Sequence, residues 1–259
     1  MLARHMQRLK SVYQHAGPVY SSLYITRRIS ESVLDHIDGW LVGIEQKRRL
    51  VEPWTIAARR FTSLTNKELW NQYDWSQAGE EWTRDQAWKD QIIRQFLEPH
   101  MPERGTILEV GPGGGRWTEI LQQRANRLVI VDVSERAIQL CRDRFPNHNN
   151  MEFQVGSGKH VNMEDGTVDA IWSYDVFVHI NPQDARSYFQ EFRRLLKPGG
   201  RAVIHHPGSA ENPGRLRKGW RSDLTNEMVL GFVQENSLRL ISQTHELVNE
   251  GDVLTVISA

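Results

Sequence analysis

The stretch LEVGPGGGRWTEIL, residues 108–121, decides how the rest of the chain is interpreted. Four of the five positions from Gly111 to Gly115 are glycine, although glycine is costly inside helices and strands. A short apolar run precedes these glycines and an amphipathic run follows them. The pattern predicts a strand, a tight glycine loop and a helix, an arrangement that brings backbone N–H groups close to a ligand.

Three familiar nucleotide sites do not fit this loop. A dinucleotide site of the form G-x-G-x-x-G needs its third glycine where this chain has Arg116, and a start at Gly113 fails at Thr118. A P-loop needs Lys followed by Ser or Thr, and no such pair follows the glycines. A short-chain dehydrogenase would carry Tyr-x-x-x-Lys, which none of the six tyrosines begins. The loop therefore holds another kind of ligand.

Composition limits the class of protein. The chain has 259 residues, enough for a large domain with an appendage, and its 32 basic side chains balance 32 acidic ones. This balance argues against a nucleic-acid partner or an anionic membrane surface. Cys141 is the single cysteine, and no run of about 18 apolar residues occurs. We expect a soluble cytoplasmic protein without a transmembrane segment.

The chain divides into two parts by pattern. Residues 1–74 are expected to form an N-terminal helical extension, because they lack strand-like alternation and show helical spacing, as in Ser30 to Arg49. The helical pattern recurs in Arg84 to Leu97. Six of the nine tryptophans precede residue 100, and the first 60 residues have twice as many basic as acidic side chains. The extension is either a solvated helical surface or a contact surface for a partner.

Residues 75–259 alternate between strands and helices, which predicts an α/β fold with a mostly parallel sheet. The expected strands are Thr106–Val110, Arg127–Val133, Met151–Val155, Val168–Trp172 and Arg201–His206. The expected helices are Trp117–Arg124, Glu135–Phe145 and Gln183–Leu196. Leu238–Leu247 and Asp252–Ser258, joined by a short VNEGD turn, predict an antiparallel hairpin at the edge of the sheet.

Four motifs in order carry a family resemblance. The first is acidic-x-G-x-G-x-G, formed by Glu109, Gly111, Gly113 and Gly115. LVIVDVS, GTVDAIWSYDVFVHI and LLKPGGRAVIHH follow it, and the terminal hairpin closes the series. Together these segments resemble the class I S-adenosylmethionine-dependent methyltransferases over residues 75–259. The resemblance implies a Rossmann-like, seven-stranded, mostly parallel sheet with an antiparallel C-terminal strand.

The resemblance also implies where S-adenosyl-L-methionine binds. The three glycines of the motif would let the backbone lie against the methionine and ribose parts, and Glu109 would orient the loop or the methionine amine. Asp132, at the end of the second strand, would accept hydrogen bonds from both ribose hydroxyls. The remaining expected cofactor residues are Val133, Ser157, Gly158, Ser173, Trp75 and Trp82.

Two of those assignments have alternatives. Many family members have an acidic residue after strand three that meets the adenine amine, whereas this chain has Ser157 there. Ser157 could replace that residue, or a backbone carbonyl could. Trp75 and Trp82 lie in the segment that often folds over the cofactor in the family, but tryptophans at this spacing are also typical of core packing.

Three histidines follow strands where an acceptor would bind. Methyl transfer to a hydroxyl requires a general base, and histidine serves that role near neutral pH. His179 is the favoured base, while His205 and His206 alternate along strand five, so at most one faces the site. Asp175 could orient a histidine or, with two histidines, ligate a Mg²⁺ ion; the spacing does not decide. Tyr174, Arg215, Trp220 and Arg221 are candidate acceptor contacts.

The favoured function is O-methylation of a small molecule or glycan, with a sugar hydroxyl as the expected acceptor. Two alternatives stay open: N-methylation of an amino sugar or other small amine, and a cofactor-binding but inactive subunit with the extension as its assembly module. A nucleic-acid methyltransferase is disfavoured, because no Asn-Pro-Pro-Tyr-like loop follows strand four. The tryptophan-rich extension hints at a homodimer.

Overall fold

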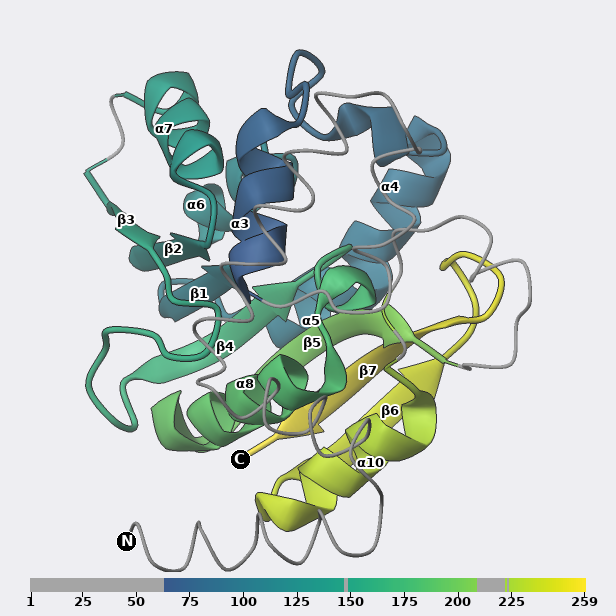
Figure 1. Ribbon diagram of the computed structural model, residues 1–259. Coiled ribbons are helices and arrows are strands. Elements are labelled where there is room, and N and C mark those ends of the chain that lie inside the picture. Colours follow the sequence, from purple (N-terminus) through teal and green to yellow (C-terminus); the bar gives the residue numbers. More distant parts are fainter. Residues whose placement is uncertain (1–62, 147–148, 209–221, 223) are drawn as a thin grey trace, which may run out of the picture.

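The computed structural model describes residues 63–146, 149–208, 222 and 224–259, and Figure 1 shows their arrangement. A twisted sheet runs through the middle of this part of the chain, with helices on both of its faces (Figure 1). The predicted α/β fold is therefore confirmed. Among the described residues, no helix combines the length and apolar character that a bilayer-spanning segment needs.

The described strands form one seven-stranded sheet in the order β3-β2-β1-β4-β5-β7-β6. Its strands are β1 (Thr106–Val110), β2 (Arg127–Asp132), β3 (Met151–Val155), β4 (Val168–Ser173), β5 (Leu196–Pro207), β6 (Arg239–Thr244) and β7 (Asp252–Ser258). The first five are parallel, and β7 lies antiparallel between β5 and β6. The terminal hairpin is thus confirmed at the sheet edge. Because β1 and β4 are central, their carboxyl ends lie side by side, as expected of a ligand site in this topology.

The connecting helices begin at side chains that cap them. α7 (Glu135–Arg144) begins after Ser134, whose hydroxyl accepts from Ala137 N, and α8 (Pro182–Leu195) begins after Asn181, whose side chain accepts from Asp184 N. These caps satisfy N–H groups that a helix start leaves without partners. α6 (Thr118–Arg124) and α10 (Asn226–Glu235) complete the helices of residues 105–259 that the structure describes.

Two apolar cores pack against the two faces of the sheet. One core joins α8 and α10 to side chains such as Val110, Val131 and Ile204. The other joins α4 (Gln86–Ile92), α6 and α7 to the alternate side chains, such as Ile130 and Trp172. Since strand side chains alternate between faces, burial on both sides explains the near-continuous apolar runs of these strands.

The segment before the sheet forms helices, in agreement with its sequence pattern. It contains α3 (Ser63–Gln72), η2 (Glu80–Trp82), α4, η3 (Ile93–Leu97) and α5 (Glu98–His100). Asp85 caps α4 by accepting from Trp88 N, so the helix begins at Gln86 rather than at the expected Arg84. α3 lies beside α7 (Figure 1), where Asn71 Oδ1 accepts from Ser134 Oγ and Arg136 N. The expected helix at residues 30–49 lies outside the described residues, and the boundary at residue 74 stays a prediction.

Several boundaries, such as those of β2, β4, α6 and α7, differ from expectation by one residue, and larger differences occur at β5 and β6. β5 begins at Leu196 rather than Arg201, because the LKPGG segment also pairs with β4, through a register shift between Val168 and Ala170. β6 ends at Thr244 rather than Leu247, because residues 245–250 turn toward β7. α8 ends one residue early, at Leu195.

Candidate active site

A cavity of about 320 Å³ opens at the carboxyl ends of β1, β2 and β4, under α3 and the aromatic segment that follows it. Ten of the expected site residues line it: Trp75, Trp82, Gly111, Gly113, Asp132, Val133, Gly158, Tyr174, Asp175 and His179. The sequence motifs, far apart along the chain, therefore meet around one space. Ser63, Asn66, Trp70, Arg84, Trp88 and Asn249 complete the wall from elements that carry no family motif.

Two glycines of the loop form the floor of the cavity. Gly111 and Gly113 have φ values of +73° and +55°, in the left-handed region that glycine tolerates best. A Cβ on Gly111 would lie 2.3 Å from Val176 Cγ2, and a Cβ on Gly113 would lie 2.6 Å from the ring of Trp75. Backbone and neighbouring side chains thus approach so closely that no larger residue fits at either position.

Gly115 packs against a neighbouring helix. It does not line the cavity, and a Cβ there would lie 2.9 Å from the ring of Phe145 and 3.3 Å from Cys141 Sγ. The third glycine therefore lets the loop pack closely against α7 and its C-terminal end. A contact between Gly115 and a cofactor stays a prediction.

Glu109 supports the glycine loop from below. Its side chain is buried, and its Oε2 accepts a 2.6 Å hydrogen bond from the hydroxyl of Thr118 in the first turn of α6. Burial raises the pKa of this carboxyl to about 8. Since Glu109 does not line the cavity, the geometry favours its role in orienting the loop over direct contact with an amine.

Asp132 presents a carboxylate at the end of β2. Its Oδ1 accepts from Ser134 N at 2.8 Å, which fixes the side chain beside the cavity. Burial raises the pKa of Asp132 to about 6, although backbone N–H groups stabilise the ionised form. A carboxylate in this position can accept hydrogen bonds from two vicinal hydroxyls.

Ser157 and Ser173 do not reach the cavity. Ser157 is exposed, and its hydroxyl accepts from Lys159 N and His160 N within its own turn. Ser173 is buried and donates to Val110 O at 3.1 Å, joining β4 to β1. Both were expected to contact the cofactor, and both instead satisfy nearby backbone groups, as serines often do.

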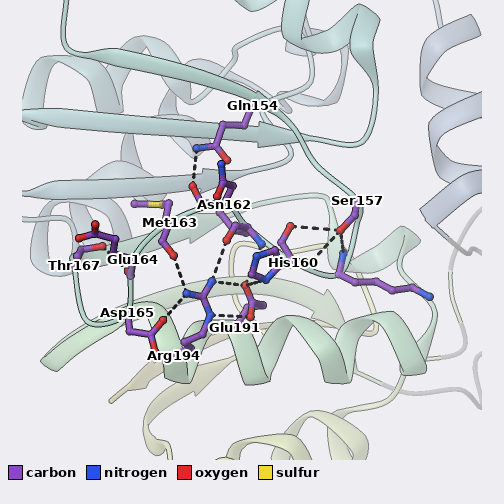
Figure 2. A network of polar contacts seen from close by, with 12 residues as sticks. Gln154, Ser157, His160, Asn162, Met163, Glu164, Asp165, Thr167, Glu191 and Arg194 are labelled. Carbon is purple, nitrogen blue, oxygen red and sulfur yellow. Dashed lines mark hydrogen bonds and ion pairs between the residues drawn. The ribbon is translucent and has the colours of Figure 1, made fainter.

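A polar network holds the loop that carries Ser157 and Gly158 (Figure 2). Arg194 on α8 donates to the backbone oxygens of Val161 and Met163 at 2.9 and 2.7 Å. Glu191 pairs with the same guanidinium and accepts from Val161 N. Only Gly158 of this loop lines the cavity, and its φ of +78° and close approach to Ser63 and Val133 exclude a side chain there.

Trp75 and Trp82 belong to an aromatic cluster that forms one wall. Trp70, Tyr73, Trp75 and Trp82 have ring centroids 4.9–6.2 Å apart, mostly in edge-to-face or tilted pairs. Trp75 Nε1 donates to Trp70 O at 3.0 Å, which fixes the ring over Gly113. Packing and cavity lining therefore coincide in these tryptophans.

His179 reaches the cavity from η4 (Phe177–His179), which follows β4. Its ring lies edge-to-face against Trp70 with centroids 5.0 Å apart. Asn66 of α3 donates to the backbone oxygen of His179 at 2.8 Å, so α3 fixes the position of the histidine. An imidazole in this place can accept a proton from a bound hydroxyl.

Asp175 joins Arg116 and His205 at the cavity wall. Its Oδ2 lies 2.5 Å from Arg116 Nη2, and its Oδ1 lies 2.9 Å from His205 Nδ1. These partners hold the pKa of Asp175 well below its usual range, while the carboxylates of Asp175 and Asp252 raise the pKa of His205. Asp175 has a φ of +61°, a conformation that a non-glycine residue adopts only under local constraint.

His205 and His206 lie behind the cavity rather than in its wall. His205 stacks on Tyr174 at 4.6 Å and contacts Asp175 and Asp252. His206 Nε2 lies 2.7 Å from Thr255 Oγ1 and its Nδ1 lies 2.7 Å from Pro207 O. Both imidazoles are buried behind the cavity wall, and a role for either as the direct base stays a prediction. The orienting role of Asp175 is supported, because it contacts His205.

The sequence interpretation missed several cavity residues. Arg116 was treated only as a bulky residue that excludes a dinucleotide site, yet its guanidinium lines the cavity and its Nη1 is buried without a hydrogen-bond partner. Asp184, Arg84 and Asn249 were missed because no local motif marks them. Arg215, Trp220 and Arg221 lie outside the described residues. Within the described part of the chain, no three His, Cys, Asp or Glu side chains are placed to hold a metal ion.

Comparison with known families places this cavity in context. Residues 107–200 match the model of a family described as a methyltransferase domain. The tRNA (carboxymethyluridine(34)-5-O)-methyltransferase of Mus musculus is 27% identical over 184 residues, covering 68% of this chain and 26% of that protein. A probable S-adenosylmethionine-dependent methyltransferase of Mycobacterium tuberculosis is 26% identical, covering 49% of this chain and 44% of that protein. The chain thus spans less than half the length of these curated relatives.

Solved structures share the fold. A protein of Pyrococcus horikoshii OT3 aligns with a TM-score of 0.56 and 23% identity, covering 68% of this chain and 92% of that one. An S-adenosylmethionine-dependent methyltransferase of Aquifex aeolicus aligns with a TM-score of 0.55 and 16% identity, covering 72% and 99%. The fold described above is therefore shared with these two proteins of known structure.

Proposed function

We propose that this chain, a member of the class I S-adenosylmethionine-dependent methyltransferases, transfers a methyl group to a hydroxyl of a small molecule or glycan. One observation carries the proposal: Asp132, the Gly111–Gly113 floor and His179 line the same cavity. The cavity thus combines a carboxylate that can bind hydroxyls, a loop whose backbone a ligand can approach closely, and a candidate general base. Of the relatives named above, only the Mus musculus protein is named for its acceptor, a carboxymethyluridine of tRNA, so the acceptor of this chain has to be argued from the cavity itself.

The residues present fit S-adenosylmethionine. Asp132 would accept from the two ribose hydroxyls, and Gly111 and Gly113 would allow the methionine part to lie on the backbone. Arg116 Nη1, buried without a partner at the cavity wall, would donate to the methionine carboxylate. Leaving such a buried donor unpaired is costly, which supports a ligand anion at this position. The bound cofactor supplies a methyl group already activated by the positive sulfur.

His179 would act on the acceptor. A hydroxyl is a poor nucleophile, and its oxygen attacks a methyl carbon more readily when a base takes its proton as the new bond forms. The imidazole of His179 is placed for this by Asn66 and Trp70. Its proton would leave to solvent after the methylated product departs.

The methyl acceptor would bind beside a second set of aromatic side chains. Trp88 and Tyr174 line the cavity near Arg84 and Asn249, and Arg84 Nη2 lies 3.4 Å from Asn249 Oδ1. Flat aromatic surfaces next to amide and guanidinium groups suit a hydroxyl-bearing ring, which offers apolar faces and polar edges. This chemistry favours a sugar or similar polyol as the acceptor class.

Calorimetric titration with S-adenosylhomocysteine tests the cofactor. Wild type should bind with micromolar affinity, and Asp132→Ala should lose about tenfold or more, because the ribose hydroxyls lose their acceptor. Absence of binding by folded wild type would contradict the methyltransferase proposal. Turnover assays with sugar hydroxyls and with amino sugars then separate O- from N-methylation, and binding without turnover on any acceptor would favour the inactive subunit.

A further inference from the structure

The end of the cavity beyond Asp132 carries a buried carboxylate without an assigned role. Asp184, in the first turn of α8, is 3% exposed and lines the cavity, although it belongs to none of the family motifs. Burying a carboxylate is unfavourable unless it is paired and hydrogen-bonded. The partners of its two oxygens therefore decide whether Asp184 can also bind a ligand.

A series of contacts leads from Asp132 to Asp184. Val133 follows Asp132, and the Cβ that glycine lacks at position 158 would lie 3.1 Å from Val133 Cγ1 and 2.3 Å from Ser63 Cβ. Ser63 N in turn donates to Asp184 Oδ2 at 2.9 Å. If Asp132 binds the ribose, as proposed above, the nucleobase attached to that ribose can extend along these contacts toward Asp184.

The cavity also has an apolar lining. Val131, Val133, Val178, Ile180 and Tyr188 line the same cavity, and four of the five side chains are aliphatic. Such a slot suits a flat heteroaromatic ring, and a small number of polar groups would then fix its orientation. Asp184 is a polar group of this kind. While it is ionised, it accepts hydrogen bonds and cannot donate them.

The two oxygens of Asp184 differ in their partners. Oδ2 accepts from Ser63 N at 2.9 Å and from Asn181 Nδ2 at 3.0 Å, so it is engaged with the protein. Oδ1 has an ion-pair contact with Lys159 Nζ at 3.4 Å, a separation longer than a good hydrogen bond. Oδ1 thus retains acceptor capacity for a donor on a ligand.

From these contacts we infer that Asp184 Oδ1 accepts a hydrogen bond from the exocyclic amine of adenine and gives the site its preference for an adenine-containing cofactor. Adenine carries this donor at N6, whereas a 6-oxo purine carries an acceptor there and would meet the carboxylate with repulsion. The inference rests on the proposed function. It also accounts for Ser157, whose hydroxyl is engaged in its own turn.

The network of Figure 2 supports this arrangement. Glu191 and Arg194, on the same helix as Asp184, hold the backbone of Val161 and Met163. The loop with Gly158 and the helix with Asp184 are therefore fixed to each other, so the slot between them keeps its width. Preorganisation of this kind increases affinity, because less ordering is needed on binding.

Paired titrations test the inference with two ligands, S-adenosylhomocysteine and its 6-oxo analogue S-inosylhomocysteine. Wild type should bind the adenosyl ligand about tenfold more tightly or better, since a buried polar mismatch costs at least that factor. In Asp184→Asn, Ser63 N–H keeps the amide oxygen at the Oδ2 position, so the amide nitrogen takes the place of Oδ1. The variant should then lose this preference or reverse it.

Asp165→Asn is the matched control. Asp165 is an exposed carboxylate that pairs with Arg194 in the same network, so the variant removes the same charge without touching the slot. It should keep the wild-type preference. Equal affinity of wild type for the two ligands overturns the inference whether or not the variant folds, and so does an unchanged preference in folded Asp184→Asn. Either result leaves the proposed function intact, whereas absence of S-adenosylhomocysteine binding by wild type contradicts that function.

Discussion

Arg116 and Asp175 form a 2.5 Å ion pair at the wall of the cavity, and Arg116 is almost fully buried there. The guanidinium also lies over the rings of Trp117 and Tyr174, 5.3 and 5.7 Å from their centroids. Nη2 of Arg116 donates to Asp175, and Nη1 is buried without a hydrogen-bond partner in the protein. The pair thus links the conformation of the chain after β4 to a donor available to a ligand anion.

Arg116→Met should reduce both stability and cofactor affinity. Removing one member of a buried ion pair leaves Asp175 uncompensated, at a cost of about 3 kcal/mol in the free energy of unfolding. Urea denaturation measures this loss, and titration with S-adenosylhomocysteine measures affinity. Adding Asp175→Asn should restore much of the stability but not the affinity. If the single variant binds the ligand as wild type does, Arg116 has no contact with the cofactor.

The glycines of the loop should respond differently to alanine. Gly115→Ala should lower the free energy of unfolding by about 1–3 kcal/mol, because its Cβ meets Phe145 and Cys141 and its φ is +94°. Gly113→Ala should also lower stability, but in addition it should weaken S-adenosylhomocysteine binding, because its Cβ displaces Trp75 from the cavity wall. Thermal denaturation and titration of both variants check this, and equal losses of affinity would contradict the separate roles.

Glu109 should make stability depend on pH. Its pKa is raised to about 8 in the folded state from an ordinary value near 4.5, so folding favours the protonated form. The stabilisation is complete below the unfolded pKa and is lost as pH rises from about 4.5 to 8. Glu109→Gln keeps an oxygen for Thr118 but has no proton to lose.

Relative to wild type, Glu109→Gln should therefore gain stability at pH 8–9, on the order of a few kcal/mol, and little at pH 5. Urea denaturation at three pH values gives the comparison. A stability difference that is the same at pH 5 and pH 9 would show that Glu109 does not titrate in this range.

Short stretches of the sequence predict part of the fold and of the site. The strands of the sheet, the terminal hairpin and Asp132 could be predicted, because apolar runs, turn residues and the glycine loop are written in short stretches. Asp184, Arg84 and Asn249 could not, since their place at the cavity depends on how distant elements pack. Gly115 and Ser157 fit the motif by position, yet neighbours decide their roles: α7 crowds Gly115, and the turn of residues 157–160 engages Ser157.

The two histidines of β5 illustrate the limit of alternation arguments. Because adjacent residues of a strand face opposite sides of the sheet, at most one of the two histidines is expected in the site. In the structure neither lines the cavity. β7 pairs with β5, so Thr255 and Asp252 supply partners for His206 and His205 within the sheet. Side-chain direction alone cannot predict such partners, because they come from a strand far along the chain.

His179→Gln should abolish most turnover while leaving the cofactor in place. Loss of a general base reduces kcat by about 100- to 10,000-fold, whereas S-adenosylhomocysteine affinity should change little, because Asp132 and the glycine floor are intact. The measurement is kcat with an excess of acceptor, beside calorimetric titration of the same protein with S-adenosylhomocysteine. His245→Gln, an exposed histidine outside the cavity, is the control. Retention of kcat in His179→Gln would show that another group acts as the base, or that the acceptor needs no base, as a neutral amine does not.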